Sequence, residues 1–142
     1  MSGRYIPIEL KIKILKRANE RCEYCQSWMR NAIHTFHIDH VIPLDKEGET
    51  EFENLALSCS GCNSAKSTKI AAKDPVSKDM VSLFHPRQQK WEDHFVWSED
   101  FIEMIGLTAV GRATIIHLRL NRIGLKNMRR LTTLAGEHPP ID

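Results

Sequence analysis

The chain has 142 residues, of which 42% are hydrophobic and 27% charged, and its net charge is +2. This composition is typical of an ordinary globular protein with a core of modest size. No apolar run approaches the roughly 20 residues that cross a bilayer, and the N-terminal sequence lacks the apolar segment of a secretory signal. We therefore expect a cytoplasmic protein with no membrane partner.

The first predicted element is a helix over residues 7–20 that leads directly into a C-x2-C pair. Four apolar residues follow the spacing of one helical face, with lysines opposite: Ile8, Ile12, Leu15 and Ala18. This spacing predicts the side of the helix that packs on the core.

Two C-x2-C pairs supply the only four cysteines of the chain: Cys22, Cys25, Cys59 and Cys62. Because the cytosol is reducing, we do not expect two disulfides. Paired C-x2-C sequences are typical of a tetrahedral structural Zn²⁺ site. The alternatives are four unrelated buried thiols, or a redox C-x-x-C, which needs only one pair. We expect zinc to join the N-terminal helix to the elements between the pairs.

Between the cysteine pairs, residues 36–44 and 54–59 are predicted to be strands, and a helix begins at the second pair. The first strand carries His37, Asp39 and His40 beside apolar residues, so titratable groups lie at the edge of the core. Adjacent strand residues point to opposite faces, so Asp39 and His40 converge on one site only where the strand bends or ends. His37 is expected to be structural or solvated, with contact to a metal or phosphate as the alternative.

Taken together, these motifs resemble the HNH (His-Me finger, ββα-metal) endonuclease family over about residues 22–69. The resemblance is carried by the pattern C-x2-C…DHVIPL…ENLALSCSGCNSAK. The resemblance implies an α+β fold with a zinc-clamped ββα-metal core and metal-dependent hydrolysis of DNA, double-stranded DNA foremost. It makes His40 the general base and gives a single divalent cation the ligands Asp39 and Asn63. It makes Asn54 the residue that ties the loop to the strand and orients the histidine.

The chemistry of these side chains agrees with those roles. An imidazole with an ordinary pKa of about 6.5 accepts a proton from water near neutral pH. Carboxylate and amide oxygens suit Mg²⁺ or Mn²⁺, with waters and phosphate filling the other positions. Asn63 stands where some members have a third histidine, which favours a harder cation than zinc. On the same helix, Lys66 is a candidate phosphate contact. Ser67 is expected to lie on the helix surface, with support of a metal-bound water as the alternative.

We expect residues 1–72 to form the nuclease core, and residues 73–142 to form an extension packed on it as one globular unit. Three short apolar runs, MVSLFHP, HFVWS and FIEMIGL, predict a small antiparallel meander. Two helices should follow, one capped by Thr108 and one ending at Gly136. This half resembles the extension of stand-alone bacterial HNH proteins. An aromatic group is expected in the core rather than as a base-stacking platform: Trp91, Phe95 and Trp97, with His94.

Basic residues gather in residues 1–30 and 111–142, around an acidic stretch over residues 31–60. This distribution suits a polyanion held at the periphery of an acidic site, and solvated helix faces are the alternative. Arg129 and Arg130 are the foremost candidates for DNA contacts. The whole basic set of the last helices is Arg112, Arg119, Arg122, Lys126, Arg129 and Arg130.

Three other functions stay open from the sequence. The chain could be a non-catalytic zinc-containing nucleic-acid-binding module, a ribonuclease on the same fold, or an interaction protein with a vestigial nuclease site. A binding module would not need Asp39, His40 and Asn63 together, so their combination favours an enzyme.

Overall fold

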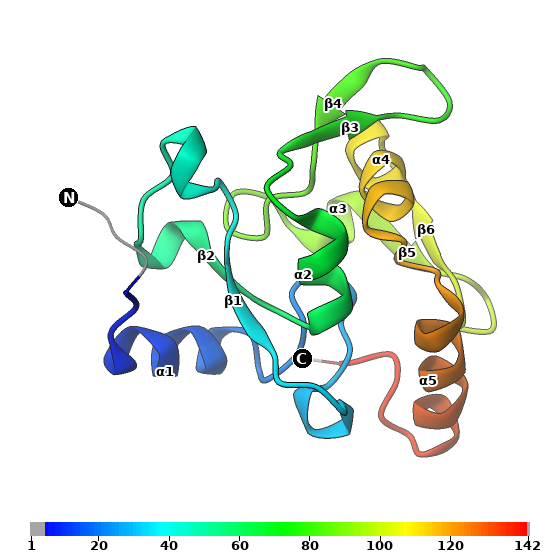
Figure 1. Ribbon diagram of the computed structural model, residues 1–142. Coiled ribbons are helices and arrows are strands. Elements are labelled where there is room, and N and C mark those ends of the chain that lie inside the picture. Colours follow the sequence, from blue (N-terminus) through cyan, green and yellow to red (C-terminus); the bar gives the residue numbers. More distant parts are fainter. Residues whose placement is uncertain (1–4, 142) are drawn as a thin grey trace. The chain divides into compact units, whose positions relative to one another are not determined.

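The computed structural model describes residues 5–141. Its helices and strands confirm the predicted α+β class (Figure 1). In chain order they are α1 (Ile8–Arg17), β1 (His37–His40), β2 (Leu55–Ser58), α2 (Ser60–Lys66), β3 (Ala71–Lys73), β4 (Met80–Ser82), α3 (Trp91–His94), β5 (Phe95–Trp97), β6 (Met104–Gly106), α4 (Ala109–Leu118) and α5 (Ile123–Leu134). Within the described residues, none of these helices has the length and apolar character needed to span a membrane.

The described chain divides into two compact units. The first runs to Ile70 and also includes the short segment His85–Gln89. The second consists of Ala71–Phe84 and the residues from Lys90 onward. Each unit has its own buried residues and is described by itself.

The first unit is built on the β1–β2 hairpin, which is antiparallel, with Asp39 opposite Ala56 and His40 opposite Leu55. Strand β2 is buried along its whole length. Helix α1 packs against β2, and α2 packs against β1. The order strand, loop, strand, helix is the one that the sequence predicts.

Strand β1 is shorter than the predicted strand over residues 36–44, because regular pairing ends at His40. One further backbone bond, from Val41 N–H to Asn54 O at 2.9 Å, continues the ladder. After Pro43 the chain enters a 3-10 turn, Leu44–Lys46. Asp39 and His40 therefore lie at the end of the strand, the position at which they can converge on one site.

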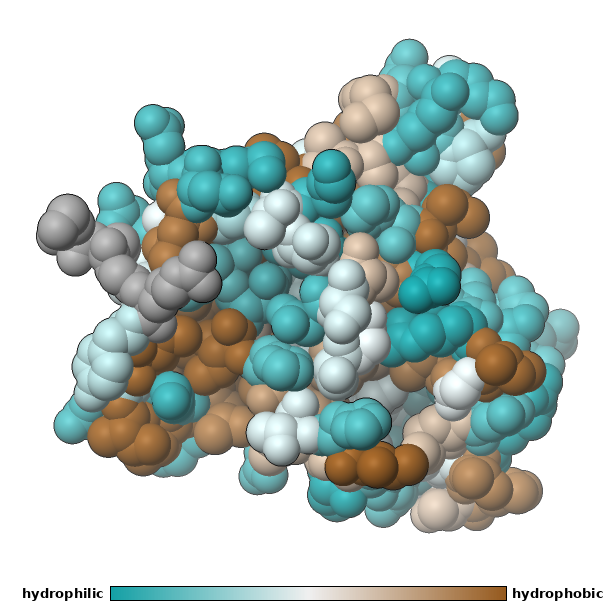
Figure 2. All heavy atoms as spheres, viewed as in Figure 1, coloured by the Kyte–Doolittle hydropathy of each residue, from teal (hydrophilic) through white to brown (hydrophobic). Residues whose placement is uncertain are grey.

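The buried face of α1 differs from the predicted one. Ile8 and Ile12 are 61% and 49% exposed, whereas Ile14 and Ala18 are buried. Figure 2 shows the corresponding apolar surface over α1 at the lower left. Arg17 explains the choice of face, because it donates to the backbone oxygen of Phe52 at 2.7 Å and to that of Leu55, next to Ile14 and Ala18. The prediction of the helix was right. Its choice of face was wrong for Ile8 and Ile12, whereas Leu15 is half-buried and Ala18 is buried as expected.

The second unit contains two separate hairpins in place of one three-stranded meander. Strand β5 pairs with β6 as expected, but β4 pairs with β3. Helix α4 packs against both hairpins. Thr108 caps α4 as predicted, because its hydroxyl accepts from Gly111 N at 3.1 Å.

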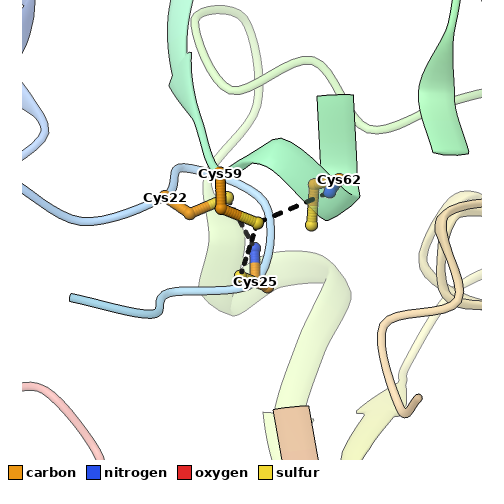
Figure 3. Close-up of side chains that lie close together, drawn as sticks. All are labelled: Cys22, Cys25, Cys59 and Cys62. Carbon is orange, nitrogen blue, oxygen red and sulfur yellow. Dashed lines mark hydrogen bonds between the residues drawn. The ribbon is translucent and has the colours of Figure 1, made fainter. Parts of the chain in front are cut away.

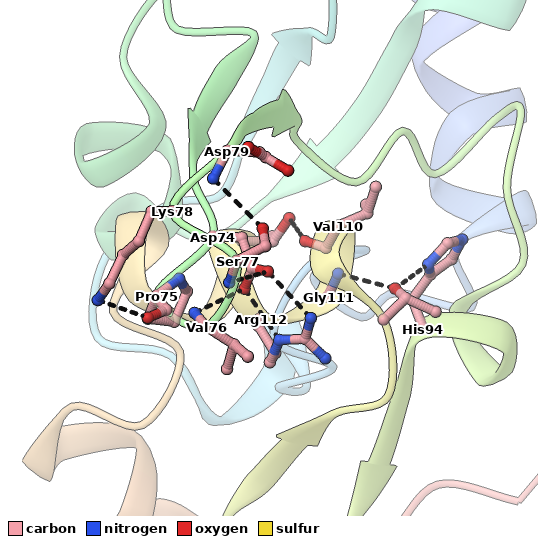
Figure 4. Close-up of polar contacts among 12 residues, drawn as sticks. Asp74, Pro75, Val76, Ser77, Lys78, Asp79, His94, Val110, Gly111 and Arg112 are labelled. Carbon is pink, nitrogen blue, oxygen red and sulfur yellow. Dashed lines mark hydrogen bonds and ion pairs between the residues drawn. The ribbon is translucent and has the colours of Figure 1, made fainter.

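Asp74 organises the turn between β3 and β4 (Figure 4). Its buried carboxylate accepts from the backbone N–H groups of Val76 and Ser77 and makes a two-pronged ion pair with Arg112, at 2.9 and 3.0 Å. The Arg112 guanidinium is the main reason that the pKa of Asp74 lies well below its usual range. Arg112 is thus engaged inside the second unit, and we withdraw it as a phosphate contact.

The aromatic group belongs to the packing of the second unit, as expected. Phe95 is buried and meets Phe84 edge to face at a centroid distance of 5.2 Å. Trp91 lies 5.3 Å from the rings of both Phe95 and Trp97. Helix α5 ends at Leu134, and Gly136 follows with a φ of 77°. This positive φ is the conformation that glycine adopts most readily after a helix.

Candidate metal centre and nuclease site

The two C-x2-C pairs converge in the first unit (Figure 3). All four cysteines are buried, and their sulfur atoms lie within 4.8 Å of one another. The Sγ atoms of Cys25 and Cys59 are 3.7 Å apart. A tetrahedral Zn²⁺ with Zn–S bonds of about 2.3 Å would place its sulfurs about 3.8 Å apart. The cluster therefore fits one zinc ion.

Backbone N–H groups support this cluster in the same way in both pairs. Cys25 N donates to Cys22 Sγ, and Cys62 N donates to Cys59 Sγ, each at 3.4 Å. Hydrogen bonds from the other thiols hold the pKa of Cys59 far below its usual range, while burial raises the pKa of Cys22.

Asn54 closes the loop between the two strands of the hairpin. Its Oδ1 accepts from Ile42 N, and its Nδ2 donates to the backbone oxygens of Ile42 and Glu49, all at 2.9 Å. Gly48 lies against the same group: an added Cβ would come within 1.7 Å of Ile42 O and 2.9 Å of Asn54 Nδ2. These contacts tie the loop to the chain just after His40, the geometry that the resemblance implies for Asn54.

Asp39 is buried and makes both of its side-chain contacts through one oxygen. Its Oδ2 accepts from the Tyr24 hydroxyl at 2.8 Å and lies 3.1 Å from Lys66 Nζ, and neither contact uses Oδ1. Burial is the main reason that the pKa of Asp39 is raised, and the Lys66 ammonium opposes it. The carboxylate is thus already held in one orientation.

His40 is half-buried and is also supported. Its Nε2 lies 2.9 Å from Thr50 Oγ1, which is within hydrogen-bond distance. If Nε2 carries the proton and Thr50 accepts it, the lone pair of the neutral ring is on Nδ1. Thr50 comes from the loop that Asn54 closes, so the loop that is tied to the backbone of Ile42 also holds the ring of His40.

A cleft of about 370 Å³ opens beside Asp39 and His40. It has room for a hydrated cation and a phosphate, and oxygen-bearing side chains line it. The lining residues are Ile6, Ile38, Asp39, His40, Pro43, Leu44, Asp45, Ser67 and Thr68. The structure thus brings the predicted base and the predicted carboxylate ligand into one cavity.

The other site residues predicted from the sequence lie elsewhere. Asn63 is half-buried on α2 and is not among the residues that line the cleft, whereas Ser67, one turn later, is. His37 is exposed at the start of β1, in line with a solvated histidine.

Two of the predicted DNA contacts have buried side chains, which argues against that role. Lys66 is 1% exposed, pairs with Asp39 and donates to Val41 O at 3.0 Å. Arg129 is 3% exposed and donates to backbone oxygens of Ile102 and Leu120. Neither can reach a phosphate without leaving these partners. Arg130 is exposed, so its candidacy stands.

Sequence reasoning missed Tyr24, Thr50, Asp45 and Thr68. Nothing in the local pattern marked them, since each is joined to the site only through folding.

Comparisons with known proteins agree with this geometry. Residues 22–69 match the sequence model of the HNH endonuclease family, a span that contains both cysteine pairs, the β1–β2 hairpin and α2. The chain is also 28% identical over 74 residues to the Septu protein PtuB of Bacillus thuringiensis. That match covers 51% of this chain but only 29% of PtuB, so the chain corresponds to less than a third of that protein. No solved structure matches.

The fold and the cysteine cluster define a small ββα core with a candidate metal site, and residues 22–69 of this core are similar to the HNH endonuclease family.

Proposed function

We propose that the protein is a metal-dependent endonuclease that hydrolyses phosphodiester bonds of double-stranded DNA. His40 is the general base, and Asp39 holds a single Mg²⁺ or Mn²⁺ together with Asn63. The observation that carries the proposal is the cleft in which Asp39 and His40 meet at the end of β1.

The residues of the cleft fit a hard divalent cation, because beside the His40 imidazole, which is assigned to proton transfer, they offer carboxylate and hydroxyl oxygens and no sulfur. When bound, such a cation supplies positive charge to the scissile phosphate. Oδ1 of Asp39 is the oxygen that can bind the cation, because Oδ2 already contacts Tyr24 and Lys66. Asn63 would have to turn its amide oxygen toward the cleft.

His40 performs the proton transfer. Its imidazole takes a proton from a water molecule, and the water oxygen attacks phosphorus while the bond from phosphorus to the 3′ oxygen breaks. The leaving oxygen takes a proton from solvent and His40 afterwards returns its proton to solvent, so the reaction consumes one water and restores the base. Thr50 keeps the ring oriented throughout.

The test is nicking of supercoiled plasmid with Mg²⁺ or Mn²⁺, and with EDTA as the metal-free arm. His40→Ala should lower the rate about 10²- to 10⁴-fold, because one acid–base group is lost. DNA affinity and zinc content should stay unchanged. His34→Ala is the matched control, since His34 is an exposed histidine outside the cleft.

Wild-type cleavage should also decline at acid pH, because a protonated imidazole cannot accept a proton. Equal nicking rates for His40→Ala and wild type at matched DNA occupancy would refute the assignment of the base. An RNA substrate tested in parallel decides between deoxyribonuclease and ribonuclease, and DNA binding without any cleavage would make the chain a binding module.

A further inference from the structure

The two inner residues of the first cysteine pair are both buried, although their side chains are polar. Glu23 and Tyr24 lie between Cys22 and Cys25 and are 9% and 1% exposed. A polar side chain in the interior requires a partner, because burial without one costs free energy. Each of the two finds its partner on a different strand of the hairpin.

Glu23 binds β2. Its backbone N–H donates to Leu57 O at 2.9 Å, and its Oε2 accepts from Leu57 N at 2.8 Å. Arg87 and Arg17 balance its charge, the latter at 3.7 Å. The cysteine pair is therefore docked on the strand that lies opposite β1.

Tyr24 binds β1 at the residue that matters for the proposed reaction. Its hydroxyl donates to Asp39 Oδ2 at 2.8 Å. Lys66, from the helix that begins at the second cysteine pair, reaches the same oxygen at 3.1 Å. Lys66 is also tied to the end of β1 through Val41 O at 3.0 Å and His40 O at 3.4 Å. Each cysteine pair thus contributes one group that holds Asp39.

We infer that Tyr24 and Lys66 are positioning residues that hold Oδ2 of Asp39 so that Oδ1 is presented to the divalent cation, and that Tyr24 connects the cysteine cluster to this ligand. The inference rests on the proposed function, in which Asp39 is the cation ligand.

The physical argument is one of preorganisation. A carboxylate that rotates freely must be ordered when the cation binds, whereas one held by two donors is ordered beforehand. Groups that hydrogen-bond to a metal ligand and orient it typically raise metal affinity about 10- to 100-fold. Since Tyr24 lies between two cysteines of the cluster, a metal ion bound there would hold the backbone from which the tyrosine reaches Asp39.

A purely structural role predicts something different. If the hydroxyl were only satisfied by the nearest acceptor, Tyr24→Phe would change stability but not the affinity of the cleft for a cation. The phenyl ring fills the same space, so packing is conserved. Tyr5→Phe is the matched control, because Tyr5 is the other tyrosine of the chain and is 79% exposed.

The experiment measures Mn²⁺ binding to zinc-loaded full-length protein by the decrease in the EPR signal of free Mn²⁺. Tyr24→Phe should weaken Mn²⁺ affinity about 10-fold and raise the Mg²⁺ concentration needed for half-maximal nicking. Zinc content should stay equal to that of wild type, and Tyr5→Phe should change neither quantity. Unchanged Mn²⁺ affinity in Tyr24→Phe would overturn the inference.

A second measurement needs no variant. With 3-fluorotyrosine incorporated, the chain gives two ¹⁹F resonances, one for each tyrosine. Saturation with Mg²⁺, which is diamagnetic, should shift the Tyr24 resonance and leave that of Tyr5 in place. A Tyr24 resonance that does not respond would overturn the inference even if Tyr24→Phe failed to fold.

The same data separate this inference from the proposed function. Wild-type protein that binds Mn²⁺ through Asp39 but cleaves no nucleic acid would refute the nuclease proposal and leave the positioning role intact. Active wild type with Tyr24→Phe unchanged in both Mn²⁺ affinity and Mg²⁺ dependence would refute the positioning role alone.

Discussion

Asn54→Ala removes the side chain that closes the loop between β1 and β2. In the native structure that side chain makes three hydrogen bonds, all of 2.9 Å: one from Ile42 N and two to the oxygens of Ile42 and Glu49. Alanine keeps the backbone bond from Val41 N to the oxygen of residue 54 but none of the three others.

The expected loss follows from counting these bonds. Each contributes about 1 kcal/mol net to stability, which gives about 3 kcal/mol for the three. Water can reach the groups left behind, because Ile42 is only half-buried and Glu49 is exposed, so a larger penalty for unpaired buried groups is not expected. For a chain of this length, the loss corresponds to a decrease of roughly 10 °C in melting temperature.

The assay is urea unfolding followed by circular dichroism, on protein loaded with zinc and checked by metal analysis. Asn127→Ala is the control, since Asn127 is an exposed asparagine on α5 whose replacement should change the free energy of unfolding by no more than about 0.5 kcal/mol. If Asn54→Ala costs no more than this control, the three hydrogen bonds do not hold the loop, and our account of how His40 is positioned is refuted.

Two further outcomes test the metal cluster and the basic surface. Purified protein should contain about one zinc ion per chain. Cys59→Ser should lose the metal and give less soluble protein, because structural zinc contributes free energy of folding. Metal analysis that finds no zinc in protein from zinc-containing medium would contradict this. Arg130→Glu should weaken DNA binding about equally for unrelated sequences in anisotropy titrations at several salt concentrations, and an affinity equal to that of wild type would mean that Arg130 only faces solvent. Arg129→Glu should instead lower the melting temperature, because it places a carboxylate among backbone oxygens.

The sequence predicted the parts of the molecule that depend on local spacing. The two C-x2-C pairs were enough to predict the cysteine cluster, and the apolar runs between them predicted both strands and the helix. Local turn chemistry likewise predicted the Thr108 cap and the end of α5 near Gly136. In the two helix ends the partners are a few residues apart, so the pattern contains the interaction itself, and in the cysteine cluster each C-x2-C pair is a local signal that the second pair repeats.

Choices between alternative surfaces could not be predicted in this way. Helix α1 carries two apolar stripes that meet at its C-cap, Ala18: one runs through Ile8, Ile12 and Leu15, and the other runs through Ile14. Periodicity does not rank them, because both have helical spacing. The contacts of Arg17 with the backbone of Phe52 and Leu55 accompany burial of the second stripe, and these residues are more than 30 positions away along the chain.

The basic residues show why charge alone is a weak guide to a nucleic-acid surface. A count of arginines and lysines treats every one as available to phosphate, yet Lys66 and Arg129 are buried and Arg112 is paired with Asp74. Long cationic side chains can reach backbone oxygens and carboxylates inside a small protein that has few other donors. Among the last two helices, exposure leaves Arg119 and Arg130 as the stronger candidates for phosphate contacts. The role of Lys66 differs most from the one expected: the sequence predicted a contact with the substrate, whereas in the structure Lys66 pairs with the carboxylate of Asp39, on which the proposed chemistry depends.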